Sequence, residues 1–329
     1  MLPHCHCWCF GNTAGLADGF IPLPQGTTVS PSSTYLGIAM QPDSPSMSPD
    51  SLPPAAPGTV ASRPCDSTIE VAPGQDVSVR LYGRKKAGQR LPVVVHFHGG
   101  AFTSGSLDNG CTVASLLEDA GALVVSVAYP LTPFPQPVDT GYGVLKWAYR
   151  NRARLGGQGA LLYLAGEEAG GNLAAAVGLM ARDQAHPPLA GQILLSPMLD
   201  PCVGTASVRE ATGDATGCKW AEGWRNFLRG PRDAEHPYAV PAAASRLAGL
   251  PPTLILVGDG DPMRDEALAY AARLRAAGLP VTQHVFSKTA TWPDALLQRQ
   301  TAPSGCPCAG AAQEQFRLFF DATRAAVPA

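Results

Sequence analysis

The sequence predicts an α/β fold in which helices cover both faces of one mainly parallel sheet. Strand and helix patterns alternate from about residue 67 to the end of the chain, which is typical of a parallel sheet between helical layers. Residues 92–98, PVVVHFH, form a nearly continuous apolar run, which favours a strand buried on both faces. Residues 312–326 close the chain with an amphipathic helix. We therefore expect ligands at the carboxyl ends of the strands.

The other elements follow in chain order from the same patterns. Residues 67–72 and 77–83 are predicted as two short strands, and a helix over 111–121 ends at Gly121, because glycine readily adopts the conformation that ends a helix. The remaining predicted elements are strand 122–129, helix 138–156, strand 160–166, helix 169–185, strand 191–197, strand 251–259, helix 265–278 and strand 280–286. We expect right-handed crossovers between the parallel strands.

The domain organisation is predicted from composition. Residues 41–64 contain seven prolines, which remove amide donors and disfavour both helix and central strand. We therefore expect residues 1–65 to be a disordered Pro/Ser-rich arm, unless translation starts later in the sequence. Residues 66–329 are predicted to form a single domain. The Gly-, Trp- and Pro-rich stretch at about 200–245 is long enough to be a cap or lid inserted into that domain.

Composition limits the partners and the compartment. The net charge of −2 and the sequence pI of about 6.4 predict no nucleic-acid partner. No apolar run approaches the ~20 residues that span a bilayer, so no membrane partner is expected. The N-terminus lacks the basic region and apolar stretch of a secretory signal, which favours a cytoplasmic location. The oligomeric state is left open.

Cysteine usage indicates a reducing compartment. The nine cysteines are an odd number in a long chain, so we expect mostly free thiols rather than a disulfide scaffold. Residues 4–9, HCHCWC, include soft metal ligands, but their spacing lacks the paired arrangement of a tetrahedral zinc site. No metal and no cofactor are predicted.

A strand-turn-helix motif at residues 160–176 is the first candidate site. Between the strand and the helix lies Gly166-Glu167-Glu168-Ala169-Gly170. The pattern G-x-S-x-G in this context is the nucleophile elbow, where glycines prevent collisions between the strand and the helix. Both glycines are present here, but a glutamate stands where the pattern has serine.

Two further motifs follow strand ends. His98-Gly99-Gly100-Ala101 follows the buried strand 92–98, and a glycine-rich turn of this kind points backbone N–H groups into a site as an oxyanion hole. Asp261 lies just past strand 251–259, where an orienting carboxylate would reach the same edge of the sheet.

These motifs together resemble the hormone-sensitive-lipase branch of the α/β-hydrolase fold, which includes bacterial esterases. The matching segments are HFHGGAF, AGEEAGGNLAA, LLSPMLD, HPYAVP and DPMRDEALAYAARLRAAGLPV. The resemblance covers about residues 67–327 and implies a hydrolase acting on carboxylic esters. It places Glu168 at the serine position and Asp261 at the acid position. It also implies that oxyanion N–H groups come from Gly100, Ala101 and Ala169, and that Glu167 replaces a structural aspartate.

The triad histidine of that family has no counterpart here. The resemblance places the histidine position at Thr291, and the only histidine after Asp261 is His284, which lies inside a predicted strand. His284 is retained as a weak candidate for a displaced base. His98 is expected to orient the oxyanion turn rather than to act as a base.

A glutamate changes the chemistry available at the elbow. It is ionised at neutral pH without a base, and its carboxylate could occupy the oxyanion hole. We therefore expect serine-type ester hydrolysis to be absent or very weak. We also expect the pocket between the oxyanion turn and the 200–245 insertion to bind a small, largely apolar molecule, with an ester-like molecule as one candidate. The alternatives are a hydrolase, lyase or cyclase that uses Glu168 as nucleophile or general base, and an esterase rescued by another group.

Overall fold

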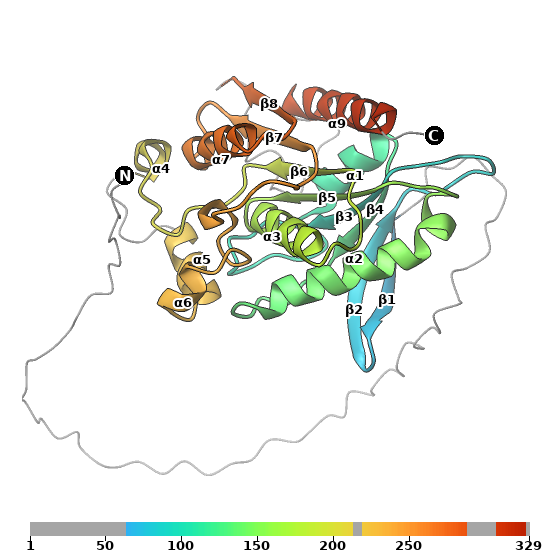
Figure 1. Ribbon diagram of the computed structural model, residues 1–329, viewed down its shortest axis with the longest axis horizontal. Helices are drawn as coiled ribbons and strands as arrows, with labels where there is room; N and C mark the ends of the chain where they lie inside the picture. The colour runs from blue at the N-terminus through green and yellow to red at the C-terminus, as the bar shows by residue number, and fades with distance from the viewer. Residues whose placement is uncertain (1–63, 213–218, 288–306, 327–329) are drawn as a thin grey trace, which may run out of the picture. The chain divides into compact units, whose positions relative to one another are not determined.

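The computed structural model describes residues 64–212, 219–287 and 307–326, and within them an eight-stranded sheet (Figure 1). The strand order is β1-β2-β4-β3-β5-β6-β7-β8. The pairs β1–β2 and β2–β4 are antiparallel, and all the others are parallel. The strands are β1 Cys65–Ala72, β2 Gln75–Tyr82, β3 Val93–Phe97, β4 Leu123–Val127, β5 Leu162–Glu167, β6 Gly191–Leu195, β7 Thr253–Gly258 and β8 Val281–Phe286. The predicted mainly parallel α/β sheet is thereby confirmed.

The central strands are buried along their whole length. Every residue of β3, β4, β5, β6 and β7 is buried, as their continuous apolar sequences predict for strands covered on both faces. The edge strand β8 alternates more and is largely accessible. The site therefore stands on strands that cannot shift without disturbing the core.

Helices cover the two faces of the sheet with separate apolar cores (Figure 1). The first face packs against α2 Gln136–Leu155, α3 Ala169–Asp183 and α7 Arg264–Ala276. The second face packs against α1 Cys111–Asp119 and α9 Pro307–Ala325. Successive residues of β3 divide between the two cores, Val93 and Val95 on the first face and Val94 on the second, because side chains alternate along a strand.

A helical insertion separates β6 from β7. Within its described part lie α4 Ala206–Thr212, α5 Lys219–Phe227, α6 Pro231–Ala234 and the 3₁₀ helix η1 Pro241–Ala243. These elements occupy the stretch for which the sequence predicts a cap or lid. The predicted N-terminal arm lies outside the described residues and stays a prediction.

Two sequence expectations concern cysteines and membranes. Cys65 and Cys111 have free thiols, whereas Cys308 is disulfide-bonded and is an exception to the expectation of mostly free thiols. Among the residues that the structure describes, every helix is too short or too polar to cross a bilayer.

Candidate functional site

The turn between β5 and α3 is sharp and is centred on Glu168. The backbone of Glu168 has φ 53 and ψ −115, a conformation that residues with a side chain rarely adopt. A Cβ at Gly166 would lie 2.2 Å from the carbonyl oxygen of Gly170, and a Cβ at Gly170 would lie 2.0 Å from that of Phe97. The two glycines are thus required by close approach of backbone, as the motif predicts.

Hydrogen bonds fix this turn to the neighbouring strand. The Glu168 N–H donates to the Leu195 carbonyl at the end of β6, at 3.0 Å. The Glu168 carbonyl accepts the N–H of Met198 at 3.0 Å and that of Asn172 at 3.2 Å. The side chain of Glu168 therefore leaves a rigid backbone at the carboxyl edge of the sheet.

The Glu168 carboxylate points at the turn that follows β3. Its Oε2 accepts the N–H of Gly100 at 2.8 Å and the N–H of Ala101 at 3.2 Å. These are two of the three predicted oxyanion donors; the third, Ala169, begins helix α3 directly after Glu168. The side chain of Glu168 is only 4% exposed, so the carboxylate is withdrawn from solvent.

Helix α5 supplies two further donors to the same carboxylate. The Trp220 indole Nε1–H donates to Oε1 at 2.6 Å, and the Lys219 Nζ lies 3.0 Å from that oxygen. The Lys219 ammonium also lies over the Trp220 ring, 4.8 Å from its centroid. Both oxygens of Glu168 are therefore bonded, one by the core of the fold and one by the insertion.

The neighbouring acid, Glu167, is also hydrogen-bonded to the turn after β3. Its Oε1 accepts the Gly99 N–H at 3.0 Å, and its Oε2 lies 2.8 Å from His96 Nε2. His96 Nδ1 in turn lies 3.0 Å from the Ser126 hydroxyl. Ser126, His96 and Glu167 are all buried. This series of hydrogen bonds, which runs from the Ser126 hydroxyl to the Gly99 N–H, is therefore a structural support for the turn.

His98 is held as an orienting residue. Its Nδ1–H donates to the Gly99 carbonyl at 2.8 Å, and its ring stacks on Tyr129 with centroids 4.3 Å apart. The Tyr129 hydroxyl donates to the His98 carbonyl at 2.8 Å. Burial lowers the pKa of His98 below its usual range, so the ring is neutral at neutral pH.

Asp261 is buried in the connection between β7 and α7. Its Oδ1 accepts the Met263 N–H at 2.8 Å, and its Oδ2 accepts a short hydrogen bond from the Ser196 hydroxyl just after β6. Asp261 thus lies at the carboxyl edge of the sheet, two strands from Glu168. Thr291, the position that the resemblance gives to a histidine, lies outside the described residues.

His284 is far from Glu168. It is in register with Leu256 of β7, which is in register with Leu195 of β6, which is in register with Glu167. Three strand spacings of ~4.8 Å put about 14 Å between His284 and Glu167 along that row. The His284 ring packs against Phe286 at 4.5 Å. In this register His284 lies beyond hydrogen-bonding distance of Glu168, and its expected role as a displaced base stays a prediction.

Helix α5 lies directly on the oxyanion turn. A Cβ at Gly223 would lie 1.8 Å from the Ala101 carbonyl oxygen, so only glycine permits this contact. One turn further, the Phe227 ring stacks on Phe102 with centroids 4.0 Å apart and planes 3° from parallel. These contacts bring α5 against the turn, in the region where the sequence predicts a pocket.

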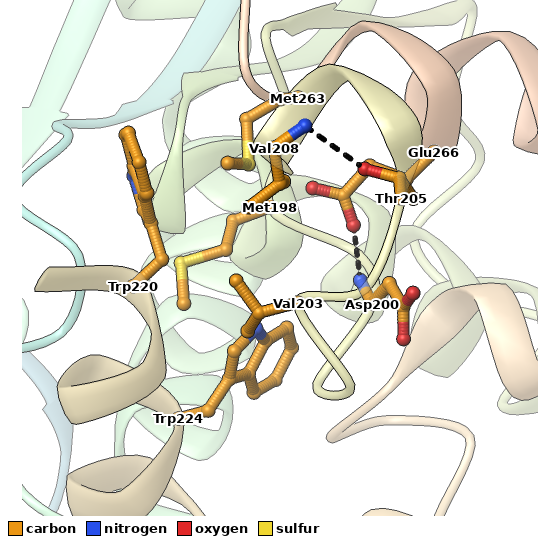
Figure 2. A pocket seen from close by; sticks show the side chains of 9 residues that line it. All are labelled: Met198, Asp200, Val203, Thr205, Val208, Trp220, Trp224, Met263 and Glu266. Carbon is orange, nitrogen blue, oxygen red and sulfur yellow. Dashed lines mark hydrogen bonds between the residues drawn. The ribbon is translucent and has the colours of Figure 1, made fainter. Parts of the chain in front are cut away.

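A narrow pocket lies between α5 and the β7–α7 connection (Figure 2). Figure 2 shows Trp220 and Trp224 projecting from α5, with Glu266 on the opposite side. About 190 Å³ lies between its walls, part of it open to solvent, and a water molecule does not fit between them in this closed arrangement. Its apolar lining consists of Met198, Val203, Val208, Trp220, Trp224 and Met263.

Glu266 is the buried acid of this pocket. Its Oε2 accepts the N–H of Leu199 at 3.1 Å and, in a short hydrogen bond, that of Asp200. Burial, together with the nearby Asp200 charge, raises the pKa of Glu266 well above its usual value.

The sequence reasoning missed the partners of Glu168 on α5, namely Lys219 and Trp220, and the support from His96. For His96 a signal existed, because a histidine inside an otherwise apolar buried strand requires a hydrogen-bonding partner. For Lys219 and Trp220 no such signal exists, because the sequence of the insertion shows that tryptophans are present but not which residues they contact.

Comparison with known proteins places these observations in a family. A protein-family model described as "alpha/beta hydrolase fold" matches residues 94–290 of this chain. The carboxylesterase NlhH of Mycobacterium tuberculosis is 35% identical over 217 residues, which are 63% of this chain and 67% of that protein. The gibberellin receptor GID1C of Arabidopsis thaliana is 33% identical over 211 residues, 59% of this chain and 60% of the receptor.

A solved structure agrees with the fold. The crystal structure of a thermostable esterase from Pseudomonas putida ECU1011 superposes with a TM-score of 0.68 at 30% identity, covering 78% of this chain and 81% of the esterase chain.

Proposed function

Because the chain belongs to the α/β-hydrolase fold family, in its carboxylesterase lineage, we propose that Glu168 fills the nucleophile position and that serine-type ester hydrolysis is absent. In its place, the chain binds a small, largely apolar molecule in the pocket beneath α5. The observation that carries this proposal is the Glu168 carboxylate, which accepts the N–H groups of Gly100 and Ala101 at 2.8 and 3.2 Å.

An oxyanion hole occupied by an internal anion is closed to a substrate carbonyl. Oxyanion donors accelerate acyl transfer because they face the position where negative charge develops. Here these donors already bond a full charge, and each charge-assisted hydrogen bond is worth about 1.5–3 kcal/mol. A neutral ester oxygen would have to displace the carboxylate and leave it buried, which disfavours productive binding.

The binding part of the proposal rests on the pocket between Trp220, Trp224 and Met263. Six of its nine lining residues are apolar, and four of these are Trp or Met, which suits a small apolar ligand. Pockets for drug-sized ligands measure roughly 300–1,000 Å³, so this one has to widen by movement of α5 before it accepts a ligand. The relative named as a gibberellin receptor supports a binding role within the same lineage.

An esterase assay with p-nitrophenyl acetate tests the proposal. We expect the wild-type chain to be inactive and the double variant Glu168→Ser/Thr291→His to hydrolyse the ester, because it introduces the serine and the histidine at the positions that the family resemblance gives to them. The single variant Glu168→Ser is the control and should stay far less active than the double variant.

Two results would contradict absent hydrolysis. Wild-type turnover that disappears in Glu168→Gln would show that this carboxylate is a nucleophile or general base, as in the hydrolase, lyase or cyclase alternative. Wild-type turnover unchanged in Glu168→Gln would show an esterase that relies on another group.

A further inference from the structure

The Glu168 carboxylate is bonded by a complete set of donors drawn from two parts of the fold. The oxyanion turn gives the N–H groups of Gly100 and Ala101 to Oε2, at 2.8 and 3.2 Å. Helix α5 gives the Trp220 indole N–H and the Lys219 ammonium to Oε1, at 2.6 and 3.0 Å. Backbone amides, an indole and a cation thus converge on one carboxylate.

The arrangement matches the shape of a carboxylate rather than that of a simple anion. Two donors serve each of the two oxygens, one pair from the turn after β3 and the other from α5. A monatomic anion at one oxygen position would satisfy one pair and leave the other pair without a partner. A planar group with two oxygens satisfies both, which is the geometric basis of carboxylate recognition.

The donors are held in place by contacts other than those to Glu168. Glu167 accepts the Gly99 N–H at 3.0 Å, so a second acid also holds the turn. Gly223 and the Phe102–Phe227 stack hold α5 against the turn. A site supported in this way keeps its shape when its occupant is removed.

We propose that Gly100, Ala101, Lys219 and Trp220 form a carboxylate-binding site shared by the core and α5, and that the Glu168 side chain is its built-in occupant. The ligand class is a small aliphatic monocarboxylate, which binds when the Glu168 carboxylate is removed or displaced. This inference rests on the proposed function in one respect, namely that Glu168 is an occupant of the oxyanion turn and not a nucleophile.

Acetate is the probe for the test. Isothermal titration calorimetry of the full-length Glu168→Ala variant, at constant ionic strength, should show one saturable site with a Kd on the order of 1 mM, a range open to a ligand of so few atoms. The wild type and Glu168→Gln should show no binding, because their side chains still fill the site. Sodium chloride at equal concentration should not compete with acetate.

Second-site variants assign the binding to these donors. In the Glu168→Ala background, Lys219→Met should weaken acetate binding at least fivefold, and Trp220→Phe should also weaken it. Lys146→Met is the matched control, because the Lys146 ammonium lies 4.8 Å from the Tyr142 ring centroid, as Lys219 lies from Trp220, and should leave the affinity unchanged.

Several outcomes would overturn the inference. These are no acetate binding to a folded Glu168→Ala protein, binding unaffected by Lys219→Met, and equal competition by chloride. If Glu168→Ala fails to fold, Glu168→Gly replaces it, because glycine adopts φ 53 without strain. Calorimetry does not depend on ester hydrolysis, so the two proposals are tested separately. A failed acetate titration would not contradict the absence of ester hydrolysis. Ester turnover by the wild type would not change the result of the titration.

Discussion

At the scale of single residues, Glu168 combines two unfavourable features that its surroundings offset. Its backbone adopts φ 53, which costs about 1–3 kcal/mol for a residue with a side chain. Its carboxylate is 4% exposed, and burying a charge without partners is costly. The donors from Gly100, Ala101, Lys219 and Trp220 provide those partners. A charged residue is stable at this turn only because both pairs of donors reach it.

Substitution of Glu168 should separate the side-chain contribution from the backbone strain. Glu168→Ala should lower the free energy of unfolding by about 1–3 kcal/mol, because buried donors lose their acceptor. Glu168→Gly should be more stable than Glu168→Ala by about 1 kcal/mol, because glycine relieves the strain at this turn. Urea denaturation followed by circular dichroism measures both differences.

Glu314 is the matched control for this comparison. It is exposed on helix α9, where glycine is less favourable than alanine by about 1 kcal/mol. The order of the Ala and Gly variants should therefore be reversed at Glu314. The same order at both positions would rule out backbone strain at Glu168.

Glu266 should make stability depend on pH. Its pKa lies well above the usual 4.5 because it is buried beside Asp200, so between those two pKa values the folded state binds a proton that the unfolded state has lost. Its contribution is complete below pH 4.5 and is lost as pH rises through the folded-state pKa. The stability of the wild type relative to Glu266→Gln, measured by urea denaturation, should therefore fall as pH rises above 4.5.

An exposed glutamate distinguishes this effect from general charge effects. Glu235→Gln, at an exposed position of the same insertion, should give a stability difference that does not change with pH. If the stability of the wild type relative to Glu266→Gln instead rises with pH, the ionised carboxylate of Glu266, and not the protonated acid, is the stabilised form.

At the scale of elements, helix α5 presents two neighbouring stripes, and the second both lines the pocket and, through Trp220, bonds Glu168. Lys219, Gly223 and Phe227 recur every four residues and contact the elbow and the oxyanion turn. Trp220 and Trp224, one position further on, line the pocket. Opening of the pocket and release of the Glu168 carboxylate are therefore coupled, because one rigid helix takes part in both.

Gly223 is the position where this docking is most sensitive. In Gly223→Ala the new methyl group would lie 1.8 Å from the Ala101 carbonyl oxygen, so α5 has to move away from the turn. We expect faster amide hydrogen exchange in α5 and a lower melting temperature, although alanine favours helix more than glycine does. Hydrogen exchange read by mass spectrometry localises the change.

The control is a helical glycine with open space around it. A Cβ at Gly310 in α9 meets no atom within 4 Å, so Gly310→Ala should leave α5 unchanged and stabilise the protein by up to about 1 kcal/mol. Unchanged exchange in α5 of Gly223→Ala would mean that this contact does not hold the helix.

At the scale of the whole molecule, the sequence was sufficient to predict the sheet and the turns that carry the site. Strands such as β3 and β5 are continuous apolar runs, and the glycines of the elbow and oxyanion turn follow them directly, so local pattern determines their place. The contact between Glu168 and Gly100, 68 residues apart, followed from a motif that places both at one sheet edge.

The contribution of α5 could not be predicted in the same way. Trp220 lies 52 residues from Glu168 and belongs to an insertion whose path over the sheet is set by packing, such as the approach of Gly223 to Ala101. Local periodicity contains no information about that approach. For the same reason, the register of β8, which places His284 opposite Leu256, could not be predicted from the sequence.

The turn after β3 gives consecutive amides to consecutive acids. Gly99 donates to Glu167, and the next two N–H groups donate to Glu168. Adding or deleting one residue between β3 and Ala101 would offset every one of these pairings, as a one-residue slip does between paired strands. The length of the short loop after β3 is therefore fixed in any variant that keeps these pairings.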